Sequence, residues 1–417
     1  MRIAVIGAGI IGVTTAYELS VDGHEVTVFE RDATVATGAS FAHTGLISPG
    51  QVMPWAADGM PLKAMAQLFK RLAPGRPGLG AVGSNAAWWW RWWRASRPAV
   101  HPLNRSRLFR LARYSRDRIE HLTGSLNLVY ERAQGHTVLL RSERDLARAR
   151  PGLKLLAELG VPFELMDAER TRQVEPGLHG GTALRGAIHL PQDGVGNCRE
   201  FAHLLKAEAH KRGARFCFQQ TVQAIEPDRQ ARVRVAGQTL AFDAVVVCAG
   251  AQAAGLLAPA GLHLPLLPVW GCSLTLPLRA VDGHGEHGPR AALMDQAQQV
   301  LISRLGRRLR VAGGAELVGD PQRFHAPTVA RLYKVLHDWF PGAAHVAQAH
   351  RWTGARPMLP DGPPVLGASG LPGVWLNVGH GDHGWALAAG SARVLADGLA
   401  GRSPDIDPDG LGIQRLA

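Results

Sequence analysis

The first 30 residues carry a hydrophobic pattern that predicts a strand, a glycine-rich turn, a helix and a second strand. Arg2–Ile6 is almost continuously apolar, Val13–Val21 has the spacing of a helix, and His24–Glu30 has a strand pattern again. The turn before the helix is Gly7-Ala8-Gly9-Ile10-Ile11-Gly12. This order of elements around such a turn is typical of a Rossmann-type nucleotide-binding unit.

The glycine turn fits a dinucleotide for stereochemical reasons. Gly7 permits the tight turn, Gly9 lets the backbone approach a pyrophosphate, and Gly12 lets the helix pack closely on the strand. Amide groups at the helix start, around Ile10 and Ile11, supply aligned donors to the phosphates. These five residues are therefore predicted to bind a cofactor.

An acidic residue stands where the second strand ends. Glu30 lies 18 residues after Gly12, and an acid at this position accepts hydrogen bonds from both ribose hydroxyls of an adenosine. It also disfavours a 2′-phosphate. Glu30 and its neighbour Arg31 therefore join the predicted cofactor site, which is an NAD or FAD site on this pattern alone.

The segment after the acidic strand end favours a flavin. Residues 37–50 are rich in glycine and in small hydroxyl side chains, which suit a loop that passes under a flavin and its phosphates through backbone donors. The candidate residues of this loop are Ser40, His43, Thr44, Gly45 and Leu46.

Two later segments resume the alternation of strands and helices. Asp193–Gly213 begins with turn residues and continues as an amphipathic helix, and it is followed by predicted strands at Arg215–Gln219 and Thr221–Glu226. Phe242–Ala251 has the pattern of a buried strand that runs into a glycine turn. Val222, Ala249 and Gly250 are the candidate cofactor contacts of these segments.

A second sheet is predicted from alternating patterns between these pieces. They include Cys272–Leu278, Val300–Arg304 and Arg308–Ala312. Near the C-terminus, glycines in 379–384 precede a helical run over Trp385–Gly398, whose first amide groups can stabilise negative charge on a reduced flavin. No internal repeat or coiled-coil pattern is visible.

Composition sets limits on the class of protein. A chain of 417 residues predicts two domains, and 46% hydrophobic with 19% charged residues is ordinary for a globular protein. The four cysteines are widely spaced, which favours a reducing compartment, and the N-terminus lacks the pattern of a signal peptide. The longest apolar stretch, Ala244–Trp270, is interrupted by glycine and proline, so it is not expected to span a membrane.

The net charge of +12 permits two interpretations. It suits nucleic acid or anionic lipid, yet only six of the 46 basic residues are lysines, and an arginine-, alanine- and glycine-rich composition is also what a GC-rich genome produces. No nucleic acid partner is expected. His380 and His383 lie three residues apart, but no cysteine or carboxylate cluster completes a metal site, so no metal is expected.

Several motifs together resemble one family. They are the glycine turn with its Ser40 loop, the segments Ser48–Gly50, Pro54–Ala57 and Pro61–Ala64, and the C-terminal pair Arg351–Gly362 and Asn377–Trp385. On these residues the chain resembles the bacterial D-amino-acid dehydrogenases, within the D-amino-acid oxidase superfamily of FAD-dependent amine oxidoreductases. One departure is clear, because the family usually has Gly-His-Gly-Thr-Leu-Gly-Trp where this chain has Asp382 and His383 in place of Thr and Leu.

The resemblance implies an α/β fold in two interleaved parts. A Rossmann-like FAD-binding domain with a glutathione-reductase-like βαβ unit is expected from residues 1–60, 190–256 and 350–417. A mostly antiparallel α+β substrate domain is expected from residues 61–189 and 257–349. The cofactor is expected to be non-covalent FAD, because no cysteine lies near the C-terminal motif.

The resemblance also assigns residues at the C-terminus. Arg356 matches the arginine that grips the substrate carboxylate, and a planar guanidinium suits bidentate binding. His380 and His383 are the other candidate catalytic residues. The remaining expected flavin contacts are Gly354, Gly379, Gly381, Asp382, Gly384 and, in addition to its catalytic candidacy, His383.

The function implied is oxidative deamination of D-amino acids to 2-oxo acids and ammonia, by hydride transfer from Cα to flavin N5. Electrons then pass to a quinone or a similar acceptor. One alternative is an enzyme for secondary amines such as proline, hydroxyproline, sarcosine or an opine, because pocket residues vary more than the scaffold. A tRNA-modifying flavin domain is a second alternative, from a different class, suggested by the basic charge.

Trp88-Trp89-Trp90-Arg91-Trp92-Trp93-Arg94 is an unusual aromatic stretch with helical i, i+4 pairs. One interpretation is an aromatic packing face. The other is peripheral contact with a membrane, which would suit a dehydrogenase that reduces a membrane quinone. The expected location is therefore cytoplasmic, with contact at the inner face of the cell membrane as the second interpretation.

Overall fold

The glycine-turn unit lies at the centre of a six-stranded sheet. The computed structural model describes residues 1–55, 86–279, 287–317 and 324–416. The sheet has the order β17-β18-β11-β1-β2-β7, and its strands are parallel except for the β17/β18 pair. The strands are β1 (Arg2–Ile6), β2 (Glu25–Phe29), β7 (Arg215–Cys217), β11 (Ala244–Val247), β17 (Val365–Ala368) and β18 (Val374–Val378).

Each face of this sheet packs against a different layer. Helices α1 (Ile10–Val21), α8 (Cys198–Lys211) and α11 (Gly384–Leu399) share a hydrophobic core with one face. The opposite face packs on a small antiparallel sheet of β8 (Val222–Glu226), β9 (Ala231–Val235) and β10 (Gln238–Phe242). Because both faces are covered, the central strands are apolar on both sides, as in the fully buried Ala244–Val247.

The second large sheet has nine strands, in the order β16-β12-β15-β14-β13-β4-β6-β3 with β5 paired to β6. The described pairs are antiparallel except for β13/β4, which is parallel. The strands are β3 (Leu46–Ile47), β4 (Arg132–Leu140), β5 (Glu164–Asp167), β6 (Gly186–Gly196), β12 (Leu267–Pro277), β13 (Ala292–Asp295), β14 (Val300–Leu305), β15 (Arg308–Glu316) and β16 (His350–Met358).

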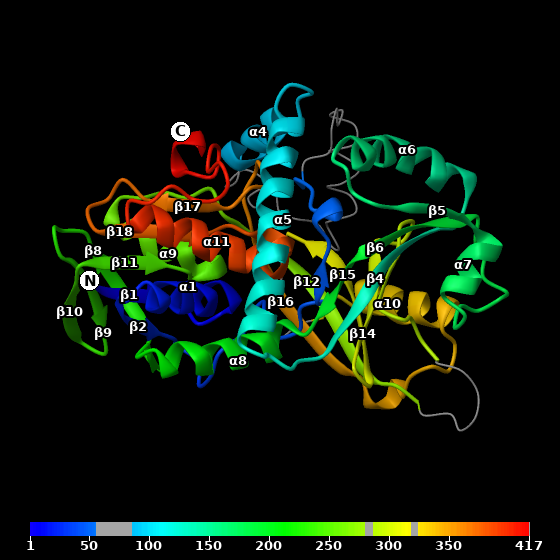
Figure 1. Cartoon of the computed structure of the whole chain (residues 1–417), viewed down its shortest axis with the longest axis horizontal. Coiled ribbons are helices and arrows are strands. Elements are labelled where there is room, and N and C mark those ends of the chain that lie inside the picture. Colours follow the sequence, from blue (N-terminus) through cyan, green and yellow to red (C-terminus); the bar gives the residue numbers. More distant parts are fainter. Residues whose placement is uncertain (56–85, 280–286, 318–323, 417) are drawn as a thin grey trace.

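Further helices surround the two sheets, which Figure 1 shows side by side. Helix α10 (Ala326–Trp339) packs on the nine-stranded sheet, and the long α5 (His101–Ser125) packs on α11. The others are α4 (Ala86–Ala95), α6 (Glu143–Glu158), α7 (Ala168–Val174) and α9 (Ala253–Leu257). Of the described helices, none combines the length and apolar composition that crossing a bilayer requires.

The aromatic helix packs most of its tryptophans inward. Trp88, Trp89 and Trp92 are buried with Leu267, Val269 and Met358 of the nine-stranded sheet. Trp90 is exposed, and arginines cover the rings on the outer side: Arg94 lies over Trp90, and Arg97 lies over Trp93. The packing interpretation therefore holds for the inner tryptophans, while the outer pairs remain on the surface.

Several element boundaries differ from the sequence-based expectation. Helix α1 begins at Ile10 rather than Val13, because the turn glycines allow the helix to start within the motif. The turn expected at Asp193 is wrong, since strand β6 continues to Gly196 and hydrogen bonds with β4 hold its polar residues in the sheet. Phe242 ends β10 rather than beginning the buried strand β11.

The division into two domains stays a prediction. Strands β3 and β16 pair in the nine-stranded sheet, although their residues fall within the ranges 1–60 and 350–417 assigned to the FAD-binding domain. The strands of the two sheets therefore alternate along the chain more often than the predicted FAD-binding and substrate ranges do. The boundary at 60/61 and the motif Pro61–Ala64 lie outside the described residues.

Candidate active site

A large cavity lies where the two sheets meet. Its volume is about 2100 Å³, and it is lined both by the glycine turn after β1 and by strands β12, β15 and β16. Small-molecule sites in proteins are commonly ~300–1,000 Å³. The cavity therefore has room for a dinucleotide and a second ligand. It contains the predicted turn, loop and C-terminal residues in one continuous space.

The glycine turn has the close contacts that its sequence predicts. Gly7 has a φ of 100°, and a Cβ there would lie 2.8 Å from the carbonyl oxygen of Cys248. A Cβ on Gly12 would lie 1.8 Å from the carbonyl oxygen of Gly7. A side chain at either position would collide with backbone. The first helical amide, that of Ile10, donates to Ser40 Oγ over 3.0 Å, so the following loop is attached to the helix start.

Glu30 is held at the cavity wall by backbone donors. One carboxylate oxygen accepts the amide of Ala8 over 2.6 Å, and the other accepts the amide of Asp32 over 3.0 Å. A carboxylate offers about four acceptor positions, so each oxygen can still accept a hydroxyl. Arg31 is exposed beside it and also lines the cavity.

Val222, Ala249 and Gly250 line the same end of the cavity. Val222 begins β8, and Ala249 follows strand β11 at its carboxyl end. Gly250 has a φ of 54° with open space around its Cα. The structure thus brings these three residues together with the glycine turn and Glu30, at the carboxyl edge of the parallel strands, where ligands bind in such sheets.

The loop at residues 43–45 is fixed through its carbonyl groups. The carbonyl of residue 43 accepts from Arg310 Nη1 (2.7 Å), that of residue 44 from Ser303 Oγ (2.6 Å), and that of residue 45 from Trp385 Nε1 (3.1 Å). Arg310 and Ser303 are buried on the nine-stranded sheet and were not predicted. In the sequence, each stands only as a polar residue within an apolar strand pattern. Such a pattern does not show which residue the polar side chain binds.

His43 is neutral and has a defined tautomer. The amide of Gly45 donates to Nδ1 over 3.1 Å, so the hydrogen is on Nε2, which donates to the carbonyl oxygen of Asp382 over 3.3 Å. Loss of solvent, together with the charges of Arg356 and Arg310, lowers the pKa of His43 to about 4. His43 therefore presents a ring N–H but no positive charge at neutral pH.

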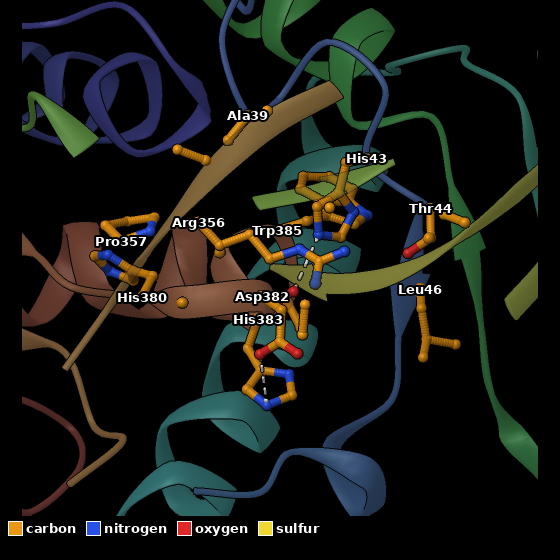
Figure 2. A pocket seen from close by; sticks show the side chains of 18 of the residues that line it. Ala39, His43, Thr44, Leu46, Arg356, Pro357, His380, Asp382, His383 and Trp385 are labelled. Atoms are coloured by element: carbon orange, nitrogen blue, oxygen red, sulfur yellow. Dashed lines mark hydrogen bonds and ion pairs between the residues drawn. The ribbon is translucent and has the colours of Figure 1, made fainter. Parts of the chain in front are cut away.

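Arg356 points from β16 into the centre of the cavity, beside the ring of His43 (Figure 2). Its Nη1 donates to the carbonyl oxygen of Gly314 over 2.9 Å. The guanidinium lies on Gly271, where a Cβ would be 2.4 Å from Nη2. Among the described residues, no carboxylate forms an ion pair within 4.0 Å of this guanidinium. A rigidly held cation is thus available to an anionic ligand.

Gly354, two residues before Arg356, lines the cavity in a different way from the prediction. A Cβ there would lie 2.1 Å from Cη2 of Trp352. Because Gly354 has no side chain, the indole ring of Trp352 on the same strand fits beside its backbone. Gly271 and Gly314 also shape the arginine site, and neither was predicted, because a single glycine in a strand does not show what approaches it.

The segment before α11 brings the C-terminal motif against the cavity. Gly379 and Gly381 have φ values of 82° and 57°, and a Cβ on Gly381 would lie 2.8 Å from Met358 Sδ. Helix α11 then starts at Gly384 without a side-chain cap, so its first amide groups are not satisfied by an N-cap side chain. Leu46 and Thr44 lie across from this helix start in Figure 2.

The two predicted histidines face different directions. His380 is buried, and its Nε2 donates to Ser391 Oγ over 3.0 Å, while the hydroxyl of Ser391 donates to the carbonyl of Leu387. Burial lowers the pKa of His380 to about 3, so the ring is neutral. Nε2 of His383 instead lies 3.1 Å from the carbonyl oxygen of Met53. This placement favours a structural role for His380 over proton transfer.

The comparisons with known proteins agree with this geometry. The family described as FAD dependent oxidoreductase (DAO) matches residues 2–74 and 71–398. The chain belongs to this family. It is also 42% identical to a D-amino acid dehydrogenase of Cereibacter sphaeroides, over 100% of this chain and 96% of the relative.

Solved structures show the same fold. Glycine oxidase from Geobacillus kaustophilus has a TM-score of 0.77 at 22% identity, covering 99% of this chain and 98% of that one. L-proline dehydrogenase from P. horikoshii has a TM-score of 0.74 at 16% identity, covering 100% and 97%. The predicted fold class is therefore confirmed. The family match shows that FAD is the cofactor of this oxidoreductase, as predicted.

A buried polar network that the sequence did not reveal also borders the cavity of this FAD-dependent oxidoreductase. Ser48 Oγ donates to Asp193 Oδ2 and lies 3.3 Å from His136 Nδ1. Burial raises the pKa of Asp193 to about 6, although the hydrogen bond from Ser48 opposes this shift. Burial also lowers the pKa of His136 to about 3. The network joins Ser48, the residue after β3, to β4 and β6.

Proposed function

We propose that this FAD-dependent oxidoreductase deaminates D-amino acids oxidatively to 2-oxo acids and ammonia. The observation that carries the proposal is the 42% identity to a D-amino acid dehydrogenase over the whole chain. The cavity supports it, because Arg356 offers to a carboxylate a guanidinium that forms no ion pair with the described residues. Dehydrogenation at Cα–N requires that this carboxylate be held while Cα–H faces the acceptor.

The residues of the cavity fit non-covalent FAD. Glu30 and Arg31 would hold the adenosine with Val222, Ala249 and Gly250, and the turn of residues 7–12 with Ser40 would hold the pyrophosphate. The ring would lie between the loop of residues 43–46 and the start of α11 with residues 379–384. When bound, FAD supplies the acceptor for the hydride from Cα.

The chain itself would supply position and charge rather than a base triad. Arg356 would grip the carboxylate in a bidentate manner, and its contacts with Gly314 and Gly271 fix the fork. Amide groups at the start of α11 would stabilise negative charge nearby. Neutral His43 would offer shape and polarity without a second cation.

Anaerobic mixing with amino acids tests the proposal. Stopped-flow absorbance should show bleaching of the bound flavin by D-amino acids and no bleaching by the L-enantiomers of the same set. Proline, hydroxyproline and sarcosine belong in the panel, because faster reduction by these secondary amines would favour the alternative substrate class. Absence of reduction by any amino or imino acid would exclude the proposed function.

We further propose that a quinone or similar carrier, rather than oxygen, reoxidises the enzyme, with peripheral contact at a membrane. Exposed Trp90 with Arg94, and Trp93 with Arg97, support this, because tryptophan and arginine are favoured at lipid headgroups. Turnover with a dye or quinone should exceed oxygen consumption. Flotation with anionic vesicles should decrease when Trp90 and Trp93 are both replaced by alanine, and absence of flotation in the parent would exclude the membrane contact.

A further inference from the structure

Asp382 places a carboxylate in the part of the cavity that contains Arg356. The residue lies between strand β18 and helix α11, and its side chain is 44% exposed. Figure 2 shows the carboxylate close to the guanidinium of Arg356, on the side away from His43.

The position of Asp382 is fixed from two sides. Its carbonyl oxygen accepts Nε2–H of His43 over 3.3 Å, which holds the backbone against the loop below. Its Oδ1 lies 3.3 Å from Nε2 of His383, the next residue. The backbone and the carboxylate therefore have separate partners, and Asp382 lines the cavity.

Asp382 and Arg356 influence each other electrostatically without forming an ion pair. Among the described residues, Asp382 forms its ion pair with His383, and its carboxylate oxygens do not come within 4.0 Å of the guanidinium nitrogens of Arg356. Partial loss of solvent inside the cavity raises the pKa of Asp382, but the charges of His383 and Arg356 outweigh this effect and lower the pKa, so the carboxyl is ionised at neutral pH. With His43 neutral, Arg356 and Asp382 place a positive and a negative group in the same part of the cavity.

We propose that Asp382 binds the ammonium group of the substrate, so that the site recognises a free α-amino acid as a zwitterion. The inference rests on the proposed function, because it assumes that Arg356 holds the carboxylate. An α-amino acid carries its two opposite charges on one carbon atom. A guanidinium and a carboxylate that face the same space are complementary to that pair. Asp382 thus acts in substrate binding, ahead of the chemical step.

The replacement Asp382→Asn separates this role from a structural one, because it removes the charge and keeps the size. D-alanine, which has both charges, should bind about tenfold more weakly, as expected for a lost hydrogen bond to a charged group. Propanoate, which is D-alanine without the amine, should bind more tightly, because a repelling carboxylate is gone. A merely structural defect would weaken both ligands.

Two equilibrium measurements give these constants. The dissociation constant of D-alanine comes from the concentration dependence of anaerobic flavin reduction, in which the limiting rate should change less than the constant. That of propanoate comes from titration of the flavin spectrum or from calorimetry, without turnover. Asp409→Asn, a change at an exposed carboxylate bound to Arg107, is the matched control and should change neither constant.

The outcomes distinguish this inference from the proposed function. Opposite shifts for the two ligands support Asp382 as the ammonium partner. Shifts in the same direction, or no shift, overturn it while leaving amino-acid oxidation intact. Failure of every amino acid to reduce the parent enzyme would remove the proposed function and this inference together. Asp382→Thr, which also removes the charge, should reproduce the asparagine result if the first variant loses flavin.

Discussion

Arg356 illustrates how single residues acquire their chemistry from contacts with backbone. The guanidinium is oriented by the carbonyl of Gly314 and by the flat surface that Gly271 leaves free. An arginine on a protein surface loses side-chain entropy when it binds a ligand. Arg356 is already ordered, so less of that cost opposes binding of a carboxylate.

The substitution Arg356→Lys should lower kcat/KM for D-amino acids by about 100-fold, mainly through KM, because a lysine keeps the charge but loses the bidentate fork. Arg356→Met should lower it further. Steady-state kinetics with a dye acceptor measure the effect, and the flavin-to-protein absorbance ratio verifies that FAD is retained. Arg229→Met, at an exposed arginine, is the control. Unchanged KM in the lysine variant would contradict carboxylate binding by Arg356.

A second residue-scale prediction concerns Asp193, whose pKa is raised from 3.8 to about 6 by burial. A raised carboxyl pKa means that the folded state prefers the protonated form. The associated stability is fully present below pH 3.8 and is lost as the pH rises through about 6. Asp193→Asn should therefore stabilise the protein by about 2 kcal/mol more at pH 7–8 than at pH 4.

Thermal unfolding of the parent and of Asp193→Asn at pH 4 and pH 8 measures this difference. Asparagine can still accept the hydrogen bond from Ser48, so loss of that bond does not complicate the comparison. Asp228→Asn, at an exposed position, should show little dependence on pH. An equal change at both pH values would show that Asp193 does not ionise between them.

At the scale of elements, the start of α1 depends on two glycines that touch backbone. A Cβ on Gly12 would fall 1.8 Å from the carbonyl oxygen of Gly7, which no rotation of a flexible side chain can relieve. The helix would have to move away from β1. That movement would also displace the amide of Ile10 from Ser40, and so the turn proposed to hold the pyrophosphate.

The variant Gly12→Ala should therefore lose FAD and about 3 kcal/mol of stability, as overpacking of a close contact does. Gly124→Ala is the matched control, because Gly124 is also helical and has open space around it. The control should bind FAD normally and be slightly more stable, by about 0.5–1 kcal/mol. Flavin content and chemical denaturation give both quantities. Normal flavin content in Gly12→Ala would show that the helix start tolerates a shift.

The elements also show which parts of the site a sequence can predict. The glycine turn and Glu30 are local, because their order along the chain fixes their geometry, and both lie as expected. Arg310 and Asp193 act on segments more than 140 residues away, at His43 and Ser48. Such contacts depend on how strands pair, so periodicity within one segment does not identify them.

At the scale of the whole molecule, the cavity is the joint between the two sheets. The six-stranded sheet contributes the nucleotide end, and the nine-stranded sheet contributes the arginine end. The loop of residues 43–45 is bound both to β14 and β15 and to α11. A cofactor that fills this joint is expected to stabilise both parts.

Removal of FAD should therefore lower the melting temperature, and added FAD should restore it. A ligand at 100 times its dissociation constant contributes about 2.7 kcal/mol to stability. Riboflavin should restore less, since it lacks the groups for Glu30 and the glycine turn. Differential scanning calorimetry of the flavin-free protein with each compound measures the effect. Equal restoration by riboflavin would contradict the assigned adenosine and pyrophosphate positions.

The sequence by itself determined the nucleotide-binding unit, the fold class and the motif that contains Arg356, because each depends on residues close together in the chain. Only the tertiary structure decided that His380 turns toward Ser391, that Asp382 faces the cavity beside Arg356, and that Arg310 anchors the loop of residues 43–45. Direction of a side chain follows from packing between segments. The local sequence pattern does not determine that packing, since one strand or helix can face many different neighbours.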